Sequence, residues 1–448
     1  MRPTISWSDL PGRRVALYGL GREGQANFRK CQELGLDPVL VDDNPPAAGR
    51  ADLGNRPILA TEMGGLDSLL ECDIVIKTPG ISRYNEAVTE LERRGVTVVG
   101  GLGLWLQEAD RSRVLCITGT KGKSTTTAIA GHLLKQLGYQ CMVGGNIGVP
   151  PYDPAHASGD YDYWVIEVSS YQATDLAASP PQVAVTSLHP DHLPWHRADP
   201  ETYFRDKLSA CSQPGADLTI ADGDSGLLQA HKDLLGPRVQ WIHADDDQGA
   251  DWMDALGLLG AHNRRNALIA HAGLRALGVP EAEDETALGS AASGFEHLES
   301  RLRPIATIDG VTFVDDSLST NVLPTLAAVD VFPQRRVALI VGGHDRSIDY
   351  VPLAEGLRTR QVETLVLTIP DNGPLIRSVL ENKGAGDAVT VVACDDLGQA
   401  VHEGFEWARP GGVVLLSPAA ASFGRFRDYR ARGDMFAEAA RACGTEQR

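Results

Sequence analysis

Residues 117–127 read ITGTKGKSTTT and stand between an apolar, strand-like run and a helix-like run. Glycines let backbone N–H groups approach phosphate oxygens, and a helix N-terminus adds the positive end of a dipole. A phosphate-binding loop usually has four residues between its first glycine and its Gly-Lys pair, whereas Gly119 and Gly122 are separated by two. The features that bind phosphate survive this shortening, so the stretch predicts a nucleotide-binding loop. A helix cap with a solvated lysine is the alternative.

The residue types of this loop also indicate how a nucleotide would be held. Lys123 can reach the terminal phosphates, and Ser124 or Thr125 can offer a hydroxyl to Mg²⁺. The residues expected to bind ATP here are Gly119, Thr120, Lys121, Gly122, Lys123, Ser124 and Thr125.

Short apolar runs alternate with helix-like runs along most of the 448 residues. This alternation predicts parallel sheets that are covered by helices on both faces. The runs DLTIADGD and RVQWIHADDD look like strands of an additional sheet, and GFEHLESRLRP at 294–304 reads as a linker before a third unit that begins with TFVDDS. We expect an α/β protein of three domains. They are a Rossmann-like domain at 1–110, a P-loop-type ATPase domain at 111–298 and a second Rossmann-like domain at 299–448.

Charge and cysteine content narrow the class of protein. The formal net charge is -18 at pH 7, which repels nucleic acid and anionic membranes, so neither is an expected partner. Seven cysteines without a CxxC pair predict reduced thiols in the cytoplasm. The first residues lack the apolar core of a signal peptide, and no apolar run approaches the ~18 residues that span a bilayer.

A second glycine-rich turn, GLGREG at 19–24, follows an apolar run and opens a helix-like run, and Asp42 ends the next apolar run. This arrangement matches the dinucleotide fingerprint, in which glycines form a tight turn and an acidic residue binds a ribose hydroxyl. The turn by itself fits a nicotinamide or flavin cofactor, another nucleotide, or a purely structural role.

Titratable side chains at the ends of later apolar runs are candidates for a metal site. Glu167 lies within an apolar strand-like run, where an unpaired carboxylate is costly, so a metal ion or a buried salt bridge must compensate it. His189, His192 and His196 could indicate zinc. No cysteine lies nearby, and a magnesium–ATP site explains a single functional histidine equally well. Surface histidines are the alternative.

Three further polar stretches follow strand-like runs or open a helix. AHNRRNA at 261–267 places Asn263 and Asn266 on one face of a helix start, while VDDSLSTN at 314–321 and SPAAASFGRF at 417–426 follow apolar strands. Ligands favour the carboxyl ends of strands in α/β sheets, although capping and turns explain such residues equally well.

Together these motifs resemble the Mur ligase family over essentially the whole chain. In order they are GxGxxG, TPGIS, ITGTKGKST, GGNIG, EVSSYQ, PDH, the DKL lysine, HNRRNA, DDSxSTN, VGG and SPAAAS. The resemblance is strongest to members that join glutamate to UDP-N-acetylmuramoyl-L-alanine in peptidoglycan synthesis. It identifies the short phosphate loop as the form usual in that family. It implies a monomeric ATP-dependent ligase that uses Mg²⁺, with two ions, and proceeds through an acyl phosphate.

The resemblance also implies site residues. In the first two domains, those facing the UDP-linked substrate are Gly19, Leu20, Gly21, Asp42, Thr78, Gly80, Asn146, Ser169 and Gln172. The implied metal ligands are Ser124, Glu167, His192 and Lys207, of which Lys207 matches a lysine that these enzymes carbamylate. With Lys123, the last three form the implied catalytic set. Asn263, Asn266, Arg301 and Asp316 complete the ATP site, and the glutamate site comprises Leu318, Thr320, Arg346, Ser422, Phe423 and Tyr429.

Departures from the family pattern cluster in the third domain. Leu318 stands where glutamate ligases have a lysine, Ser300 where a histidine is common, and Arg346 where a lysine usually follows VGG. Arg346 could grip a carboxylate in bidentate fashion where lysine offers a point charge. We therefore expect the branch that adds L-glutamate. Drift within a D-glutamate enzyme is the alternative.

Three other classes compete with this interpretation. A folylpolyglutamate-type ligase lacks a UDP-binding first domain, so residues 1–110 argue against this class. A pyridine-nucleotide dehydrogenase would leave the ATP loop unused. A non-catalytic nucleotide-binding module has no need of Glu167, His192 and Lys207 together.

Overall fold

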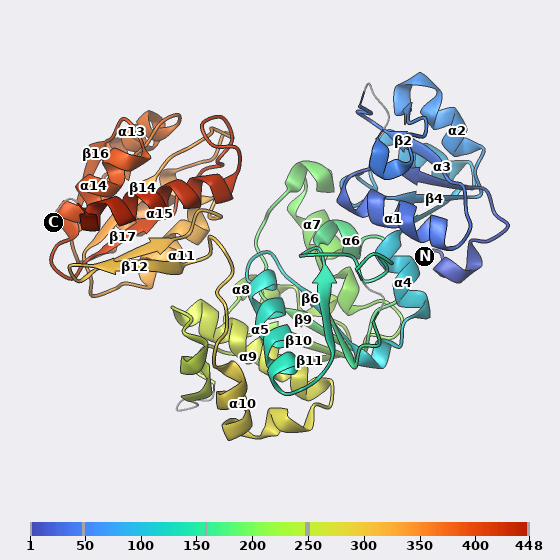
Figure 1. Cartoon of the computed structure of the whole chain (residues 1–448), viewed down its shortest axis with the longest axis horizontal. Helices are drawn as coiled ribbons and strands as arrows, with labels where there is room; N and C mark the ends of the chain where they lie inside the picture. The colour runs from blue at the N-terminus through green and yellow to red at the C-terminus, as the bar shows by residue number, and fades with distance from the viewer. Residues whose placement is uncertain (1, 47–49, 157–158, 247–250, 446–448) are drawn as a thin grey trace. The chain divides into compact units, whose positions relative to one another are not determined.

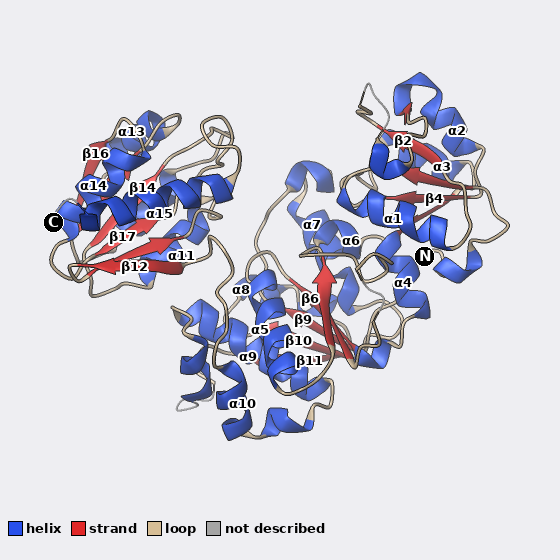
Figure 2. Cartoon of the chain, viewed as in Figure 1, coloured by secondary structure: helices blue, strands red, loops and turns tan. Residues whose placement is uncertain are grey.

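A computed structural model describes residues 2–46, 50–156, 159–246 and 251–445. The chain divides into two compact units, Met1–Gly257 with Asn263–Phe295, and Leu258–His262 with Glu296–Arg448 (Figure 1). The first unit contains two sheets and the second unit contains one. Helices flank each sheet (Figure 2), so the expected α/β fold class is confirmed.

The first sheet is parallel and has the order β3-β2-β1-β4-β5. Because β1 lies centrally and pairs with β2 on one side and β4 on the other, the strand order reverses beside β1, where α/β sheets bind ligands. Its strands are β1 (Val15–Tyr18), β2 (Val39–Asp42), β3 (Leu59–Ala60), β4 (Ile74–Lys77) and β5 (Thr97–Gly100), and its helices are α1 (Arg22–Glu33), α2 (Leu66–Leu70), α3 (Glu86–Arg93) and α4 (Gly101–Glu108).

The second sheet is also parallel, with the order β11-β10-β9-β6-β8-β7. Its strands are β6 (Val114–Thr118), β7 (Cys141–Gly145), β8 (Tyr163–Glu167), β9 (Gln182–Val185), β10 (Leu218–Asp222) and β11 (Arg238–Ile242). The helices are α5 (Lys123–Gln136), α6 (Ser170–Ala173), α7 (Pro200–Leu208), α8 (Gly226–Ala230), α9 (Ala261–Ala276) and α10 (Glu285–Ala292).

The separate sheet expected for DLTIADGD and RVQWIHADDD does not form. Strand β10 pairs in parallel with β9, and β11 pairs in parallel with β10, so both strands extend the second sheet. Alternating exposure along β11 fits an edge position and explains why the local pattern resembled a different sheet. Asp247, the last residue of the second run, lies outside the described residues.

One hydrophobic core joins the first two sheets. It contains Trp7, Leu104 and Trp105 from the first 110 residues together with Val168 and Tyr203 from the central part. The rings of Trp105 and Trp164 have centroids 5.2 Å apart. A shared core of this kind explains why both sheets belong to one compact unit.

The third sheet has the order β12-β13-β17-β14-β15-β16, with β12 antiparallel and the other pairings parallel. Alternate residues of β14 face two different cores, one with α11, α12 and α13 and the other with α14 and α15. The strands are β12 (Arg303–Ile308), β13 (Val311–Asp315), β14 (Val337–Val341), β15 (Thr364–Thr368), β16 (Val389–Ala393) and β17 (Val413–Leu416), and the helices are α11 (Val322–Asp330), α12 (Val351–Leu357), α13 (Gly373–Lys383), α14 (Leu397–Ala408) and α15 (Tyr429–Thr445).

Strand β12 precedes the run that was expected to begin this unit. Asp309 and Gly310 both have positive φ, 47° and 77°, and connect β12 to β13. An Asp-Gly pair of this type is a strong hairpin signal because the turn requires positive φ at both residues. The turn was therefore encoded locally, after the segment at 294–304 interpreted as a linker and before the run TFVDDS.

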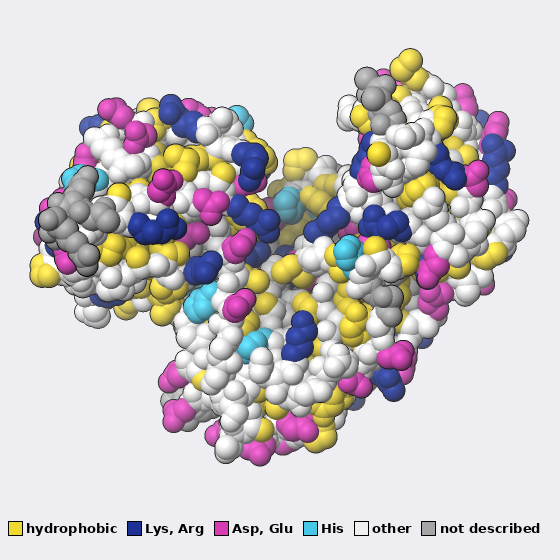
Figure 3. Space-filling model, viewed as in Figure 1, with side chains coloured by type: hydrophobic (Ala, Val, Ile, Leu, Met, Phe, Trp, Pro, Cys, Tyr) yellow, Lys and Arg dark blue, Asp and Glu magenta, His cyan; other side chains and the backbone are white. Residues whose placement is uncertain are grey.

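The surface and the thiols fit the composition. On the face drawn in Figure 3, acidic side chains occur on both units. All seven cysteines are buried, and none forms a disulfide bond within the described residues. Within the described parts of the chain, no helix combines the length and the apolar character needed to cross a membrane.

Candidate functional site

The loop at 119–122 has a backbone that requires glycine. Gly119 and Gly122 have φ of 135° and 87°. A Cβ atom on Gly119 would lie 2.2 Å from Thr186 Oγ1, and one on Gly122 would lie 2.6 Å from Asn266 Oδ1. The short loop is thus closely packed, with glycine at both positions needed to fit it between β6 and α5.

Two lysines converge on the carbonyl oxygen of Gly119. Lys123 Nζ donates to it at 2.8 Å and Lys207 Nζ at 2.9 Å. Lys207 is only 2% exposed, and burial, followed by the charge of Lys123, lowers the pKa of Lys207 well below its ordinary value. A lowered pKa favours the neutral amine, which is the form that reacts with carbon dioxide to give a carbamate.

Glu167 is the last residue of β8, and its two carboxylate oxygens differ in their hydrogen bonding. Oε1 accepts a hydrogen bond from Asn146 Nδ2 at 2.5 Å, whereas Oε2 is buried without a hydrogen-bond partner among the described residues. A buried, unpartnered carboxylate oxygen is costly, and oxygen is the ligand that Mg²⁺ prefers. The carboxylate therefore fits a bound cation.

No group of three His, Cys, Asp or Glu side chains that could hold a metal is found in the described ranges. A cation beside Glu167 would therefore take further ligands of another kind. A hydroxyl, a modified lysine, water and phosphate oxygens are the suitable candidates.

Two of the three candidate histidines, His192 and His196, have different surroundings. His196 is fully buried, with Nδ1 2.6 Å from Asp206 Oδ2 and Nε2 3.1 Å from Ser170 Oγ. His192 is largely exposed and its ring lies 5.5 Å from that of Tyr171. His196 is thus a hydrogen-bonded core residue, while His192 remains accessible to a ligand.

Asn263 and Asn266 lie near the start of α9 and face the phosphate loop through Asn266. Asn266 Nδ2 donates to Asn263 Oδ1 at 3.2 Å, and Asn266 packs against Gly122. Arg265 anchors this end of the helix through ion pairs with Asp222 at 3.0 Å and Asp224 at 2.8 Å.

In the first sheet, the GLGREG turn is held by residues that were expected to face the UDP-linked substrate. A Cβ on Gly19 would lie 2.2 Å from Thr78 Oγ1. Leu20 N donates to Asp42 Oδ2 at 2.7 Å, so Asp42 fixes the turn through its backbone. Gly21 caps α1 at its N-terminus, and nothing lies within 4 Å of a Cβ placed on Gly21 or Gly80.

Ser169 and Gln172 form the capping box of α6. Gln172 N donates to Ser169 Oγ at 3.2 Å, and Ser169 N donates to Gln172 Oε1 at 2.9 Å. Arg22 of the glycine-rich turn donates to the carbonyl oxygen of Asn146 at 2.6 Å. This bond places Asn146, a candidate UDP-substrate residue of the second sheet, beside the glycine-rich turn of the first sheet.

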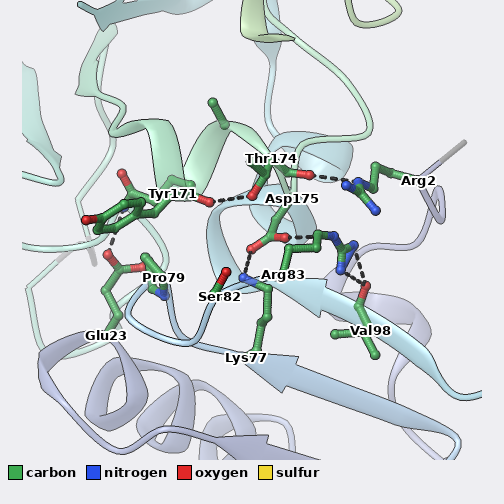
Figure 4. A network of polar contacts seen from close by, with 12 residues as sticks. Arg2, Glu23, Lys77, Pro79, Ser82, Arg83, Val98, Tyr171, Thr174 and Asp175 are labelled. Atoms are coloured by element: carbon green, nitrogen blue, oxygen red, sulfur yellow. Dashed lines mark hydrogen bonds and ion pairs between the residues drawn. The ribbon is translucent and has the colours of Figure 1, made fainter. Parts of the chain in front are cut away.

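A buried ion cluster that the sequence did not predict lies close to the glycine-rich turn that carries Glu23 (Figure 4). Lys77 Nζ is 2.6 Å from Asp175 Oδ2, and Arg83 Nε is 3.3 Å from Asp175 Oδ1. Lys77 is fully buried, and this burial lowers the pKa of Lys77. The lysine at the end of the apolar run DIVIK was the one local signal of an internal partner.

In the second unit, Asp316 is enclosed by donors. Its Oδ1 accepts from Leu302 N at 3.1 Å and its Oδ2 from Ser417 Oγ at 2.7 Å. Burial raises the pKa of Asp316 to about 7. Leu318 is half-buried and its N–H donates to Ser300 O at 3.1 Å, and Arg301 and Thr320 are also half-buried.

Two residues of the candidate glutamate site meet at the surface of the second unit. The guanidinium of Arg346 lies 5.3 Å from the ring centroid of Phe423, and both side chains are exposed. Ser422 is buried, and half-buried Tyr429 begins α15.

Arg432 is a second residue without a sequence signal. It is fully buried and donates to the carbonyl oxygens of Ser317 at 2.7 Å and Ala420 at 3.1 Å. Burial lowers the pKa of Arg432 to about 10. These bonds tie the loop after β13 to the loop after β17, both of which carry candidate residues.

Comparison with known proteins agrees with the motifs and the fold. Residues 117–255 match the Mur ligase middle domain, and residues 300–420 match the Mur ligase glutamate ligase domain. The UDP-N-acetylmuramoyl-L-alanine--L-glutamate ligase of Micromonospora sp. is 39% identical over 97% of this chain and 98% of its own length. The protein of the same name from Xanthomonas euvesicatoria pv. vesicatoria is 38% identical over 97% of this chain and 96% of its own length.

Solved structures share the fold at low sequence identity. MurF ligase from Thermotoga maritima, in complex with ADP, has a TM-score of 0.55 at 13% identity, with 97% of this chain and 95% of that chain covered. UDP-N-acetylmuramate-alanine ligase from the same organism has a TM-score of 0.53 at 19% identity and covers 96% and 99%. The chain belongs to the Mur ligase family.

Proposed function

We propose that this chain uses ATP to join L-glutamate to the carboxylate of UDP-N-acetylmuramoyl-L-alanine, releasing ADP and phosphate. The observation that carries the proposal is the convergence of Lys123 and Lys207 on Gly119 beside the unpartnered oxygen of Glu167. The names of the full-length relatives supply the two substrates.

The proposed reaction activates a carboxylate, which is a poor acylating agent. A carboxylate oxygen attacks the γ-phosphorus of ATP, the bond to ADP breaks, and an acyl phosphate forms. The glutamate amine then attacks the carbonyl carbon. Collapse of the tetrahedral intermediate breaks the carbon–oxygen bond to phosphate, and the amine loses a proton as the amide forms. Lys123 stabilises the negative charge that develops on the transferred phosphoryl group.

Bound magnesium would supply further charge neutralisation at the phosphates. Ser124, Glu167, His192 and a carbamylated Lys207 are the residues proposed to hold two Mg²⁺ ions. The unpartnered buried Glu167 oxygen supports this set, as does burial of Lys207. The ATP would lie along the phosphate loop, against Asn263 and Asn266, with Arg301 and Asp316 completing its site.

The amino-acid end of the site is assigned to the second unit. Arg346 and Phe423 would hold glutamate, since a guanidinium can bind a carboxylate with two parallel hydrogen bonds. Thr320, Ser422, Tyr429 and the apolar Leu318 would complete this site. The preference for L-glutamate is supported by the changed residues 318 and 346 and by the relatives' names.

We assign the UDP group, ATP and the amino acid to domains at 1–110, 111–298 and 299–448. The turn at 19–24 beside the reversal of strand order supports the first assignment. We also propose that the protein acts in the cytoplasm as a monomer. The compartment is supported by seven buried cysteines that form no disulfide bond within the described residues.

An assay of ADP release tests the proposal. Purified protein with ATP, Mg²⁺ and UDP-N-acetylmuramoyl-L-alanine is given either L- or D-glutamate, with no glutamate as the control. We expect turnover with L-glutamate at least about 100-fold above that with D-glutamate, a difference of about 2.7 kcal/mol. Turnover with D-glutamate alone would assign the chain to the D-adding enzymes, and no turnover with either would refute the ligase assignment.

A further inference from the structure

Glu23, the acidic residue within GLGREG, contacts the central part of the first unit. It is the second residue of α1, and its Oε1 accepts a hydrogen bond from Gln172 Nε2 at 2.8 Å. Figure 4 shows Glu23 facing the segment that carries Tyr171 and Asp175. Neither the fingerprint nor the proposed chemistry uses this carboxylate.

The direction of this hydrogen bond follows from its neighbour. The backbone N–H of Ser169 can only donate, so the Gln172 atom 2.9 Å away must be the carbonyl oxygen Oε1. The other end of the amide, the NH₂ group, then faces Glu23, which must accept. An ionised carboxylate has only acceptors, so it holds Gln172 in a single orientation.

Charged groups surround this carboxylate from several elements. Arg22 and Lys77 favour its ionised form, and Asp175 opposes it. Burial is the largest influence and raises the pKa of Glu23 to about 7. Burial, followed by the charge of Glu23, raises the pKa of the Tyr152 phenol. A protonated carboxyl group keeps a carbonyl oxygen, so the bond from Gln172 can persist in either state.

We propose that Glu23 is a positioning residue that orients Gln172, and through it Ser169, to bind the UDP-linked substrate. The inference rests on the proposed function, in which Ser169 and Gln172 hold the muramoyl peptide. In this arrangement one turn serves two purposes, because its glycines face the nucleotide while its acidic residue orders the substrate residues of the next domain.

Steady-state kinetics of the full-length enzyme separates this role from a general structural one. Glu23→Leu removes the oxygen that accepts the hydrogen bond from Gln172. Glu23→Gln keeps such an oxygen, although its amide group can rotate. We expect Glu23→Leu to raise the KM for UDP-N-acetylmuramoyl-L-alanine about 10- to 100-fold, and Glu23→Gln to raise it less than about 5-fold. The KM for ATP and kcat should stay within about twofold. Glu33→Leu, on the same helix at a surface pair with Lys30, is the matched control and should match wild type.

Coupling to Gln172 provides an independent test. If Glu23 acts through Gln172, the double variant Glu23→Leu/Gln172→Leu should bind the UDP-linked substrate no worse than Gln172→Leu alone. Additive losses would overturn the inference, and so would an unchanged KM in Glu23→Leu. A parallel rise in the KM for ATP would also overturn it, because it would indicate a general structural defect.

Failure of the two proposals can be told apart. If the wild-type enzyme does not turn over UDP-N-acetylmuramoyl-L-alanine, the proposed function falls and the inference falls with it. If the wild type turns over and Glu23→Leu binds this substrate normally, only the inference falls. Should Glu23→Leu fail to fold, Glu23→Gln decides: a KM raised less than about 5-fold with normal ATP kinetics supports the inference, and a general loss opposes it.

Discussion

The two compact units hold their candidate residues in different ways. In the first unit, Lys207 and Glu167 are almost fully buried, and Lys207 donates a hydrogen bond to the phosphate loop. In the second unit, Phe423 is 53% exposed and stacks with an exposed Arg346. Electrostatic stabilisation of phosphoryl transfer requires fixed groups in a dry environment, whereas an amino acid can be gripped by groups at a surface. The buried residues proposed for phosphoryl transfer thus lie in a core, whereas Arg346 and Phe423, which are proposed to hold glutamate, lie at the surface.

The buried charged side chains of the two units also differ in the partners that they bind. Asp175 joins Lys77 and Arg83, residues on strands or loops of the first sheet, to the α6 segment of the second sheet. In the second unit, the buried Arg432 binds backbone carbonyls and ties two neighbouring loops. In the first unit, long-range ion pairs therefore supplement the shared hydrophobic core that joins the two sheets.

The largest effect expected is on catalysis through Lys207. We predict that Lys207→Ala lowers kcat by at least about 10³-fold. The variant removes a side chain that is proposed to hold Mg²⁺ and so to help neutralise the negative charge of the phosphates. Short carboxylic acids should restore part of the activity if the native lysine carries a carbamate. Lys232→Ala, at an exposed position of a short 3-10 helix, is the control and should be active. Full activity of Lys207→Ala would contradict the proposed role, and absence of rescue would weaken the carbamate assignment.

The next effect concerns stability of the first unit. Asp175→Asn removes the carboxylate that is shared by buried Lys77 and Arg83, and loss of one partner of a buried pair costs about 3–5 kcal/mol. Urea unfolding of the first unit should shift to lower midpoint accordingly. The matched control is Asp371→Asn, which breaks an exposed 3.1 Å pair with Arg425 in the second unit and should leave stability unchanged. Equal losses in the two variants would erase the contrast between the units.

A smaller, selective effect is expected at Arg346. Arg346→Leu should raise the KM for glutamate about 10- to 50-fold, since a charge-assisted hydrogen bond contributes roughly 1.5–3 kcal/mol. The KM values for ATP and for the UDP-linked substrate should be unaffected. Arg377→Leu, an exposed arginine paired with Glu381 on α13, serves as control. If all three KM values rise together, the second unit is not specialised for the amino acid.

The smallest effect is a pH-dependent difference in stability at Glu23. Its pKa of about 7 lies above the value of 4.5 expected in the unfolded chain, so the folded state retains a proton that the unfolded state has released. This contribution to stability is present below about pH 4.5 and is lost as the pH rises through 7. The melting temperature of Glu23→Gln relative to wild type should therefore rise by a few degrees from pH 5 to pH 8. A constant difference over this range would show that the carboxyl group titrates normally.

The sequence predicted the parts of the molecule that have local signatures. The glycines of the phosphate loop follow an apolar strand and precede a helix, and Glu167 interrupts an apolar run, so both could be identified without a structure. The Asp309-Gly310 hairpin also had a local signal, although the third unit was expected to begin only after it, with TFVDDS. Strands β10 and β11 were recognised as strands, but their partner strands were not.

Interactions between distant residues could not be predicted in this way. Lys77 and Asp175 are 98 positions apart, and nothing near Asp175 marks it as the partner of a buried lysine. Arg432 lies in a polar helix, where an arginine is ordinarily exposed. His196 resembled a surface or metal-binding histidine until its bonds to Asp206 and Ser170 were visible. Each of these roles depends on tertiary packing that brings separate segments together.

Isotope transfer tests most directly whether the enzyme activates a carboxylate by phosphorylation. UDP-N-acetylmuramoyl-L-alanine carrying ¹⁸O in both carboxylate oxygens is incubated with the enzyme, ATP, Mg²⁺ and L-glutamate, and the released phosphate is analysed by mass spectrometry. The acyl-phosphate route predicts one ¹⁸O atom in the phosphate for each amide formed, with the other ¹⁸O retained in the amide carbonyl. Unlabelled phosphate accompanying labelled amide product would contradict the account.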